Sequence, residues 1–516
     1  MFRVSSPTLR TVFTLTIRPS VRLLSAILVT SLGVVTASCT NKATSAKAPA
    51  LPPTPSPSPA PVQKAKVMAK DQADFFDAKR IHAISVSFQQ GDYDQLIESY
   101  KQNNTKEWMK ADVTIDGRTY RQAGMRLKGN SSLFSIGGRR RGGFAGAANL
   151  ADGAFPPGFA GDGGPGGSAD AKKPESLPWL IRLDKYVDDQ AHQGNTEFVV
   201  RSSTTKTALN EIVALELLER AGLASERSAS VRLRMNSSPA ILRLVIESPN
   251  QQWMERWFGA RGQLYKADST GDYSYRGTDP ESYRQAWSQE AGDKDISPLI
   301  EFLKFVNNSS DFDFEAKLPD RFDVDSFARY LAIQELFNNF DDIDGPGNNS
   351  YLHYDQAAKR FTVVAWDHNL AFLGFPFGGG EFGHVFGGVG GVGGLRGDTG
   401  SNPDTDTGLG GLLPAPDTTS IAADTVPEAP ASPDKFFPSF LQKSNALVSR
   451  FHKVASFEAK YEAAKNKLAS TVFGDDAKAL LKQRAAVITA GASDLIDRAT
   501  VVEESATIEA ALQASP

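Results

Sequence analysis

The sequence predicts an α+β fold that is rich in strands in its first half and rich in helices in its second. Three observations predict it: polar and apolar residues alternate over 111–128, apolar residues recur at helical spacing over 206–221, and charged amphipathic segments follow Ser432. With 516 residues, 41% of them hydrophobic, the chain can bury a sizeable core. Its net charge of -4 shows no basic excess, so we expect no nucleic-acid partner.

Each element follows from a local pattern. Residues 111–128 alternate around an Asp116–Gly117 turn, which is typical of a β-hairpin. The pattern over 206–221 predicts an amphipathic helix, with Gly222 as its C-terminal cap. The remaining predicted elements are a second hairpin over 231–247, a helix over 325–337, a third hairpin with strands 349–354 and 360–366, and the helices after 432.

The first 38 residues are typical of an export signal. Arginines precede an apolar run over 23–35 that is too short to span a bilayer comfortably. Cys39 follows as the only cysteine in the sequence, so disulfides within the chain are excluded. Its setting resembles a bacterial lipobox, whose acylated cysteine tethers a protein to a membrane, although Thr36 stands where leucine is usual. The alternative is an ordinary cleaved signal with an incidental cysteine.

Three stretches lack the apolar periodicity of packed elements. Residues 39–66 are rich in Pro, Ala, Ser and Thr, which predicts an extended linker after Cys39. The Gly-rich run over 137–172 and the Gly-, Pro-, Asp- and Thr-rich run over 374–433 are predicted to be disordered insertions. The predicted folded domain is therefore 67–500, followed by a C-terminal tail over 501–516.

Oxygen-bearing side chains gather around the third hairpin. The midpoint of positions 349 and 367 falls inside its turn, so Asn349 and Asp367 are predicted to face each other with Cβ atoms roughly 5 Å apart. Asp341, Asp342 and Asp344 lie on the loop that enters this hairpin. Such oxygens suit Mg²⁺, which proteins bind through one or two carboxylates plus substrate phosphates. A solvated acidic turn without a metal is the alternative.

The order of Asp, loop, Asn, hairpin and Trp-Asp in residues 341–367 resembles the catalytic end of the CotH (spore-coat protein H) kinase family. The resemblance runs from about 74 to 488 and implies an atypical, diverged protein-kinase-like fold with two lobes and Gly-rich insertions. By likeness to protein kinases, Asn349 and Asp367 bind Mg²⁺ or Mn²⁺ on ATP. The proton-accepting residue is Asp342 if the Asn-x-Tyr pattern is aligned, or Asp344 if the Asp-to-Asn spacing of ordinary kinases is used.

A second segment, Met125–Ser132, carries the same resemblance. It places Arg and Lys before a turn of amides and hydroxyls, which offers a polyphosphate positive charge and hydrogen-bond donors. A tight surface turn is the alternative. Glu211, in the predicted helix, matches a kinase glutamate that pairs with a basic residue. The residues that the resemblance assigns to the nucleotide are Arg126, Lys128, Gly129, Asn130, Ser131, Ser132, Glu247 and Lys266.

The resemblance implies transfer of phosphate from ATP to Ser or Thr of an exported or envelope protein. The enzyme itself would be a lipoprotein, anchored at the cell envelope through Cys39. An exported protein meets little ATP, so an inactive pseudokinase-like protein with a binding or envelope-assembly role is the main alternative. A hydrolase is another, because a carboxylate and Mg²⁺ can activate water as readily as a hydroxyl.

Overall fold

The computed structural model describes residues 74–129, 131–133, 136, 169–259, 261–268, 270–345, 347–373 and 445–514. All of them belong to one compact unit, Ala65–Pro516. The predicted export signal, Cys39, the linker, Asn130, nearly all of the first predicted insertion and the second insertion lie outside the described residues.

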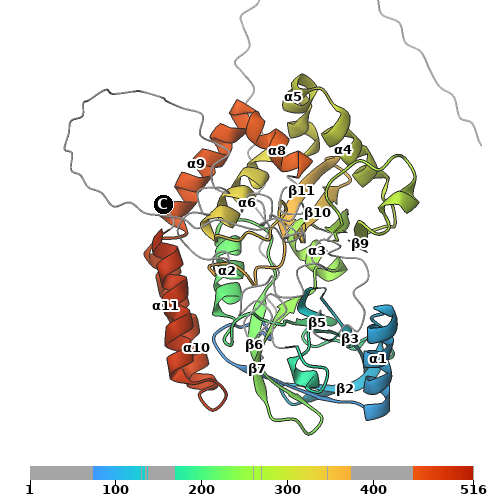
Figure 1. The fold of residues 1–516 in the computed structure, drawn as a ribbon, viewed down its shortest axis with the longest axis vertical. Helices are drawn as coiled ribbons and strands as arrows, with labels where there is room; N and C mark the ends of the chain where they lie inside the picture. Colours follow the sequence, from blue (N-terminus) through green and yellow to red (C-terminus); the bar gives the residue numbers. More distant parts are fainter. Residues whose placement is uncertain are drawn as a thin grey trace, which may run out of the picture. The chain divides into compact units, whose positions relative to one another are not determined.

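Seven strands form a closed barrel (Figure 1). In barrel order they are β1 (His82–Ser87), β2 (Met109–Ile115), β3 (Arg118–Leu127), β4 (Trp179–Arg182), β5 (Glu197–Val200), β7 (Ile241–Glu247) and β6 (Ser228–Met235). Neighbouring strands are antiparallel except β1 and β6, which close the barrel in parallel. The predicted hairpins over 111–128 and 231–247 are confirmed as β2–β3 and β6–β7. Helix α1 (Gln90–Asn103) contacts β2.

Part of the barrel wall buries both of its faces. Trp179, Ile181 and Val200 belong to the core inside the barrel, whereas Leu180 and Val199 belong to the core shared with the rest of the unit. Successive side chains of a strand point to opposite faces, so β4 and β5 are continuous apolar runs without alternation. The outer core includes α2 (Leu209–Arg220), which confirms the helix predicted over 206–221.

A separate antiparallel sheet has the order β11 (Arg360–Ala365), β10 (Ser350–Asp355), β8 (Gln263–Ala267) and β9 (Trp287–Ala291). The third predicted hairpin is confirmed as β10–β11, and the helix predicted over 325–337 as α6 (Val324–Leu336), which contacts β11. The other helices before residue 373 are α3 (Gln251–Phe258), α4 (Ser297–Asn308) and α5 (Asp311–Arg321).

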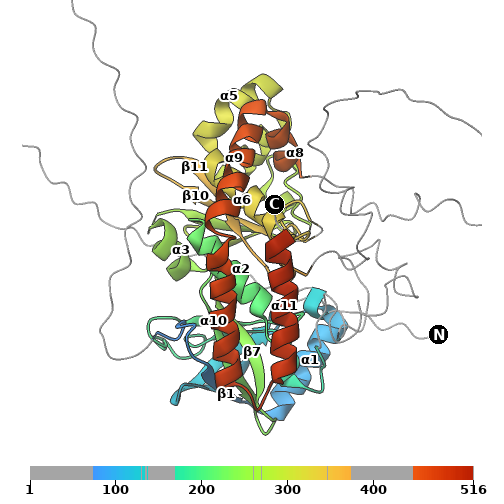
Figure 2. The ribbon, with the colours of Figure 1, turned by 90° about the vertical axis from the view of Figure 1, so that its left-hand side faces the viewer.

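The C-terminal part is helical, as predicted. It consists of α8 (Ala446–Lys453), α9 (Ala455–Thr471), α10 (Asp475–Gly491) and α11 (Arg498–Ala514). Helices α10 and α11 run side by side and both contact α2 (Figure 2). The residues predicted as a tail are therefore part of α11 as far as Ala514. No helix among the described residues combines the length and apolar character that crossing a bilayer requires.

The predicted two-lobed, diverged protein-kinase fold is wrong. The described residues form a closed seven-stranded barrel and a separate four-stranded sheet with helices around them. Closure depends on the parallel pairing of β1 with β6, in which His82 lies opposite Val231. Alternation within a strand reveals that a strand exists but carries no information about so distant a partner.

Candidate active site

The hairpin β10–β11 brings Asn349 and Asp367 to one end of the small sheet. Ser350 pairs with Ala365, and continuing this register places Trp366 opposite Asn349. The predicted direct pairing of Asn349 with Asp367 is therefore wrong by one residue. Asp367 has a φ of 64°, a left-handed conformation that costs a non-glycine residue on the order of 1 kcal/mol. Such backbone outliers cluster at functional sites.

The loop before β10 folds back around Asp341. Its carboxylate oxygen Oδ1 accepts a hydrogen bond from the Gly347 N–H at 2.6 Å, and its carbonyl oxygen accepts one from Nδ2 of Asn349 at 2.7 Å. A Cβ at position 347 would lie 2.8 Å from both Asp341 Oδ1 and Asn349 Nδ2, so a larger residue there would displace these two side chains. Because Nδ2 of Asn349 donates here, Oδ1 is its atom suited to a metal.

The negative charge of Asp367 acts on the carboxylate of Asp341. Burial raises the pKa of Asp341 to about 6; the hydrogen bond from Gly347 opposes this rise and the negative charge of Asp367 adds to it. An electrostatic effect of this kind requires the two groups to be near one another. We call Asp341, Asn349 and Asp367 the oxygen group.

The two predicted catalytic residues make other contacts. Asp342 Oδ1 accepts a hydrogen bond from the Asp344 N–H at 2.9 Å. Burial raises the pKa of Asp342 to about 7, and the charge of Asp344 adds to this rise. The exposed Asp344 accepts a hydrogen bond from the backbone N–H of Asn445, the residue that caps α8.

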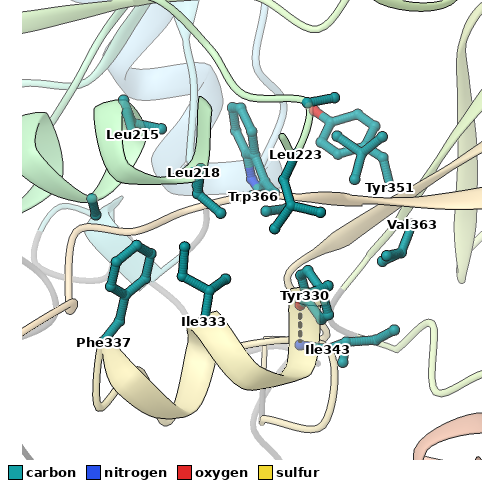
Figure 3. Close-up of a cluster of buried hydrophobic side chains, with 14 of the residues drawn as sticks. Leu215, Leu218, Leu223, Tyr330, Ile333, Phe337, Ile343, Tyr351, Val363 and Trp366 are labelled. Carbon is teal, nitrogen blue, oxygen red and sulfur yellow. Dashed lines mark hydrogen bonds between the residues drawn. The ribbon is translucent and has the colours of Figure 1, made fainter. Parts of the chain in front are cut away.

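Between them, Ile343 anchors the loop in the core. Its side chain is fully buried, and its N–H donates to the hydroxyl of Tyr330 in α6 at 3.1 Å (Figure 3). In the same cluster Tyr351 packs edge-on against Trp366 with ring centroids 5.3 Å apart. The acidic loop and the Trp-Asp pair are thus both fixed by packing at this end of the sheet.

Arg201 links Asp367 to α2. Its Nε lies 2.8 Å from Oε1 of Glu211, which is buried in the first turn of α2, and its guanidinium also pairs with Asp367 Oδ1. Glu211 therefore pairs with a basic residue, as predicted. Burial by itself would lower the pKa of Arg201, but the negative charges of Asp367 and Glu211 outweigh this effect. The net result is a raised pKa, so the guanidinium stays protonated.

Lysines gather on the Trp366 side of the oxygen group. The Nζ atoms of Lys128 and Lys266 lie 5.8 and 5.9 Å from the centroid of the Trp366 ring, and Cζ of Arg201 lies 5.8 Å from it. Burial lowers the pKa of both Lys128 and Lys106 to about 8, and the charge of Lys266 lowers them further.

Arg126 belongs to the same neighbourhood, because its charge also lowers the pKa of Lys106 and of Lys128. We call Lys106, Arg126, Lys128 and Lys266 the cation cluster. Neighbouring positive charges that lower the pKa of Lys106 and Lys128 would be stabilised by a bound anion, so this cluster suits a phosphate chain.

The other residues assigned to the nucleotide have different surroundings. Gly129 has a φ of 122°, and a Cβ there would collide with Oγ of Ser132. Ser131 begins a short 3-10 helix that ends at Leu133. The Glu247 carboxylate accepts hydrogen bonds from Arg227 and Arg256 at the end of β7, so it does not join the cation cluster.

Arg201, Lys106 and Trp366 were not predicted as site residues. Trp366 carried a usable signal, since it directly precedes Asp367 at the end of a predicted strand. Arg201 and Lys106 had none, because each reaches the site by packing of segments far apart in the sequence. Asp341 was recognised only as one of three acidic loop residues.

Glu226 is a buried acid close to this network. The residue is 2% exposed, and among the described residues its carboxylate has no hydrogen-bond partner on another residue. Burial raises the pKa of Glu226 to about 8, and the charge of Glu247 adds to the rise. The folded chain therefore holds a proton at neutral pH that the unfolded chain releases.

This proton makes stability pH-dependent. Between pH 4.5 and 8 the folded state binds more protons than the unfolded state, so the free energy of unfolding falls as pH rises. Glu226→Gln is expected to reduce this fall by on the order of 3 kcal/mol between pH 4.5 and 7. Urea unfolding at pH 5, 6, 7 and 8 measures it, with exposed Glu301→Gln as the control. Equal pH slopes for the wild type and Glu226→Gln would contradict the expectation.

Among the described residues, no three His, Cys, Asp or Glu side chains gather in a way that would hold a metal ion by themselves. Within the oxygen group, the carboxylate of Asp367 and Oδ1 of Asn349 fit Mg²⁺ or Mn²⁺ when phosphate oxygens complete the coordination.

Comparison with known proteins gives one family. A family model described as CotH kinase protein matches residues 166–513. No curated protein gives a significant match. The matched span contains the oxygen group, Arg201, Glu211 and Lys266, and it begins after Lys128.

Proposed function

The chain belongs to the CotH kinase protein family, and on that premise we propose that it is a metal-dependent protein kinase. In this proposal it transfers the terminal phosphate of ATP to a Ser or Thr hydroxyl of an exported or envelope protein. The observation that carries the proposal is the convergence of the oxygen group and the cation cluster on Trp366 and Asp367. Kinase catalysis depends on positioning and on neutralising phosphate charge, and these two groups supply both.

The residues divide into three roles in this proposal. Asp367 and Asn349 would hold Mg²⁺ or Mn²⁺, whose charge would neutralise that of the phosphate oxygens. Lys128 and Lys266 bind the phosphate chain as cationic donors. Arg201 fixes the orientation of Asp367, since it pairs with Oδ1 of that carboxylate.

We assign the proton acceptor to Asp341 in preference to Asp342 and Asp344. Asp341 is the acidic loop residue whose pKa responds to Asp367, and a pKa of about 6 leaves it ionised at neutral pH. The substrate oxygen forms a bond to the terminal phosphorus, the bond from phosphorus to the ADP oxygen breaks, and the hydroxyl proton moves to Asp341.

The ion pair between Arg201 and Asp367 favours a second candidate function, that of a binding protein without kinase activity. The guanidinium already neutralises the carboxylate on which metal binding depends. A protein that never displaces this pair would be an inactive, pseudokinase-like binding protein of the envelope.

Incubation of the purified protein with γ-labelled ATP, Mg²⁺ or Mn²⁺ and envelope extract tests the proposal. Metal-dependent label on protein is the expected result. Label released only as free phosphate would indicate a hydrolase. Absence of label, together with no thermal shift by ATP and metal, would favour the binding protein.

Lys128→Gln is expected to weaken ATP binding about 10- to 100-fold, because it removes one charged hydrogen-bond donor to phosphate, worth roughly 1.5–3 kcal/mol. The dissociation constant of a fluorescent ATP analogue measures the change. Lys110→Gln, an exposed lysine on β2, is the matched control. Equal affinities for the two variants would remove Lys128 from the site.

Export and lipid anchoring through Cys39 are also part of the proposal and rest on the sequence of the first 39 residues. Mass spectrometry of the protein from membranes tests them, since an acylated Cys39 at the N-terminus is the expected species.

A further inference from the structure

Helix α2 begins without a side chain that caps it from the N-cap position, because Ala208 has a φ of 56° and offers no side-chain hydrogen bond to the helix. The first helical N–H, that of Leu209, instead donates to the hydroxyl of Thr207 at 3.2 Å. The first N–H groups of a helix need acceptors, and a carboxylate there is also favoured by the helix dipole.

Glu504 of α11 binds the residues that lead into α2. Its Oε1 accepts from the Lys206 N–H at 2.8 Å, and its Oε2 accepts from the Thr207 N–H at 3.0 Å and from the Thr207 hydroxyl. One carboxylate thus satisfies three donors from nearly 300 residues away in the sequence. A second link joins the helices, because Arg484 of α10 forms a bidentate ion pair with Glu216 of α2 at 2.5 and 2.8 Å.

The segment held by Glu504 is braced against the loop that follows Asp367. The Thr204 hydroxyl and Nδ2 of Asn210 each donate to the carbonyl oxygen of Asn369 at 2.7 Å. Arg201 and Glu211 flank the same segment and pair with each other, and Arg201 also pairs with Asp367. A shift of this segment would therefore move the partners of Asp367.

We propose that Glu504 is a positioning residue: through α11 it fixes the start of α2, and with it Arg201 and Glu211, against the Asp367–Asn369 loop. The C-terminal helix pair is then a built-in clamp that keeps the metal-binding carboxylate oriented. The clamp is a feature of the fold, whereas its effect on metal use and phosphoryl transfer rests on the proposed function.

Glu504→Ala is tested in the full chain beside Glu503→Ala, an exposed neighbour on α11. Hydrogen exchange is expected to rise at least 10-fold at the amides of residues 205–212 in Glu504→Ala alone. The Mn²⁺ concentration for half-maximal transfer is expected to rise about 10-fold and kcat to fall about 10-fold. Arg484→Ala separates stability from positioning: it is expected to lower Tm with a smaller change in the Mn²⁺ requirement.

Unchanged exchange, or a Mn²⁺ requirement equal to that of Glu503→Ala, would overturn the clamp. If the wild type transfers no phosphate, the proposed kinase function is wrong, but the positioning role of Glu504 can still be tested. Mn²⁺ binding measured by electron paramagnetic resonance then tests that role. Weaker Mn²⁺ binding in Glu504→Ala than in Glu503→Ala would still support the clamp, and equal binding would overturn it.

Discussion

Replacement of Asp367 by Asn is expected to lower kcat for phosphoryl transfer about 1000-fold, an increase of ~4 kcal/mol in the activation barrier. The reason is that Asp367 is proposed to hold the metal, whose charge stabilises the transferring phosphate most strongly in the transition state. Initial rates over a range of Mg²⁺ and Mn²⁺ concentrations measure the effect. The metal concentration for half-maximal rate should rise together with the loss of kcat.

Asp355→Asn is the matched control for this substitution. Asp355 lies on the same hairpin at its turn, where its Oδ1 accepts from the N–H groups of Ala357 and Ala358, and Asn retains that oxygen. Thermal unfolding of both variants separates catalysis from folding, because Asp367→Asn also removes one partner of Arg201. Transfer by Asp367→Asn within tenfold of the control, with an intact fold, would exclude Asp367 as the metal ligand.

Local sequence patterns predicted the elements of this site but not how they meet. Two strand-like runs, 349–354 and 360–366, flank a polar turn, and this pattern was enough to predict β10–β11. The register was wrong by one, since it was taken from the midpoint of two chosen residues. The real turn pairs Asp355 with Arg360 and uses a left-handed residue, Lys359. Such turn geometry sets the register and is not visible in hydrophobic periodicity.

Contacts between distant segments could not be predicted from periodicity. Arg201 and Asp367 are 166 positions apart, and their pairing depends on how α2 packs against the barrel and the small sheet. The closure of the barrel was not predicted for the same reason, because β1 and β6 are far apart in the sequence.

Asp341→Asn is expected to lower kcat about 100- to 1000-fold, within the range by which a positioned general base accelerates reactions. Asp342→Asn is expected to lower it less than tenfold. Asn at position 341 keeps Oδ1 as an acceptor for the Gly347 N–H, so the loop is expected to retain its fold. Steady-state kinetics at saturating ATP and metal compare the two variants, and Tm confirms that both are folded.

The pH dependence of kcat/KM, which reports the pKa values of the free enzyme, gives an independent decision between these two residues. A general base must be ionised, so kcat/KM falls as pH drops through its pKa. If Asp341 is the base, log(kcat/KM) of the wild type should rise with pH and level off above about 6, and Asp341→Asn should lack this limb. If Asp342 is the base, the midpoint should lie near 7 and Asp342→Asn should show the larger loss. A midpoint near 6 that persists in Asp341→Asn would mean that neither assignment holds, because the titrating group would then be elsewhere.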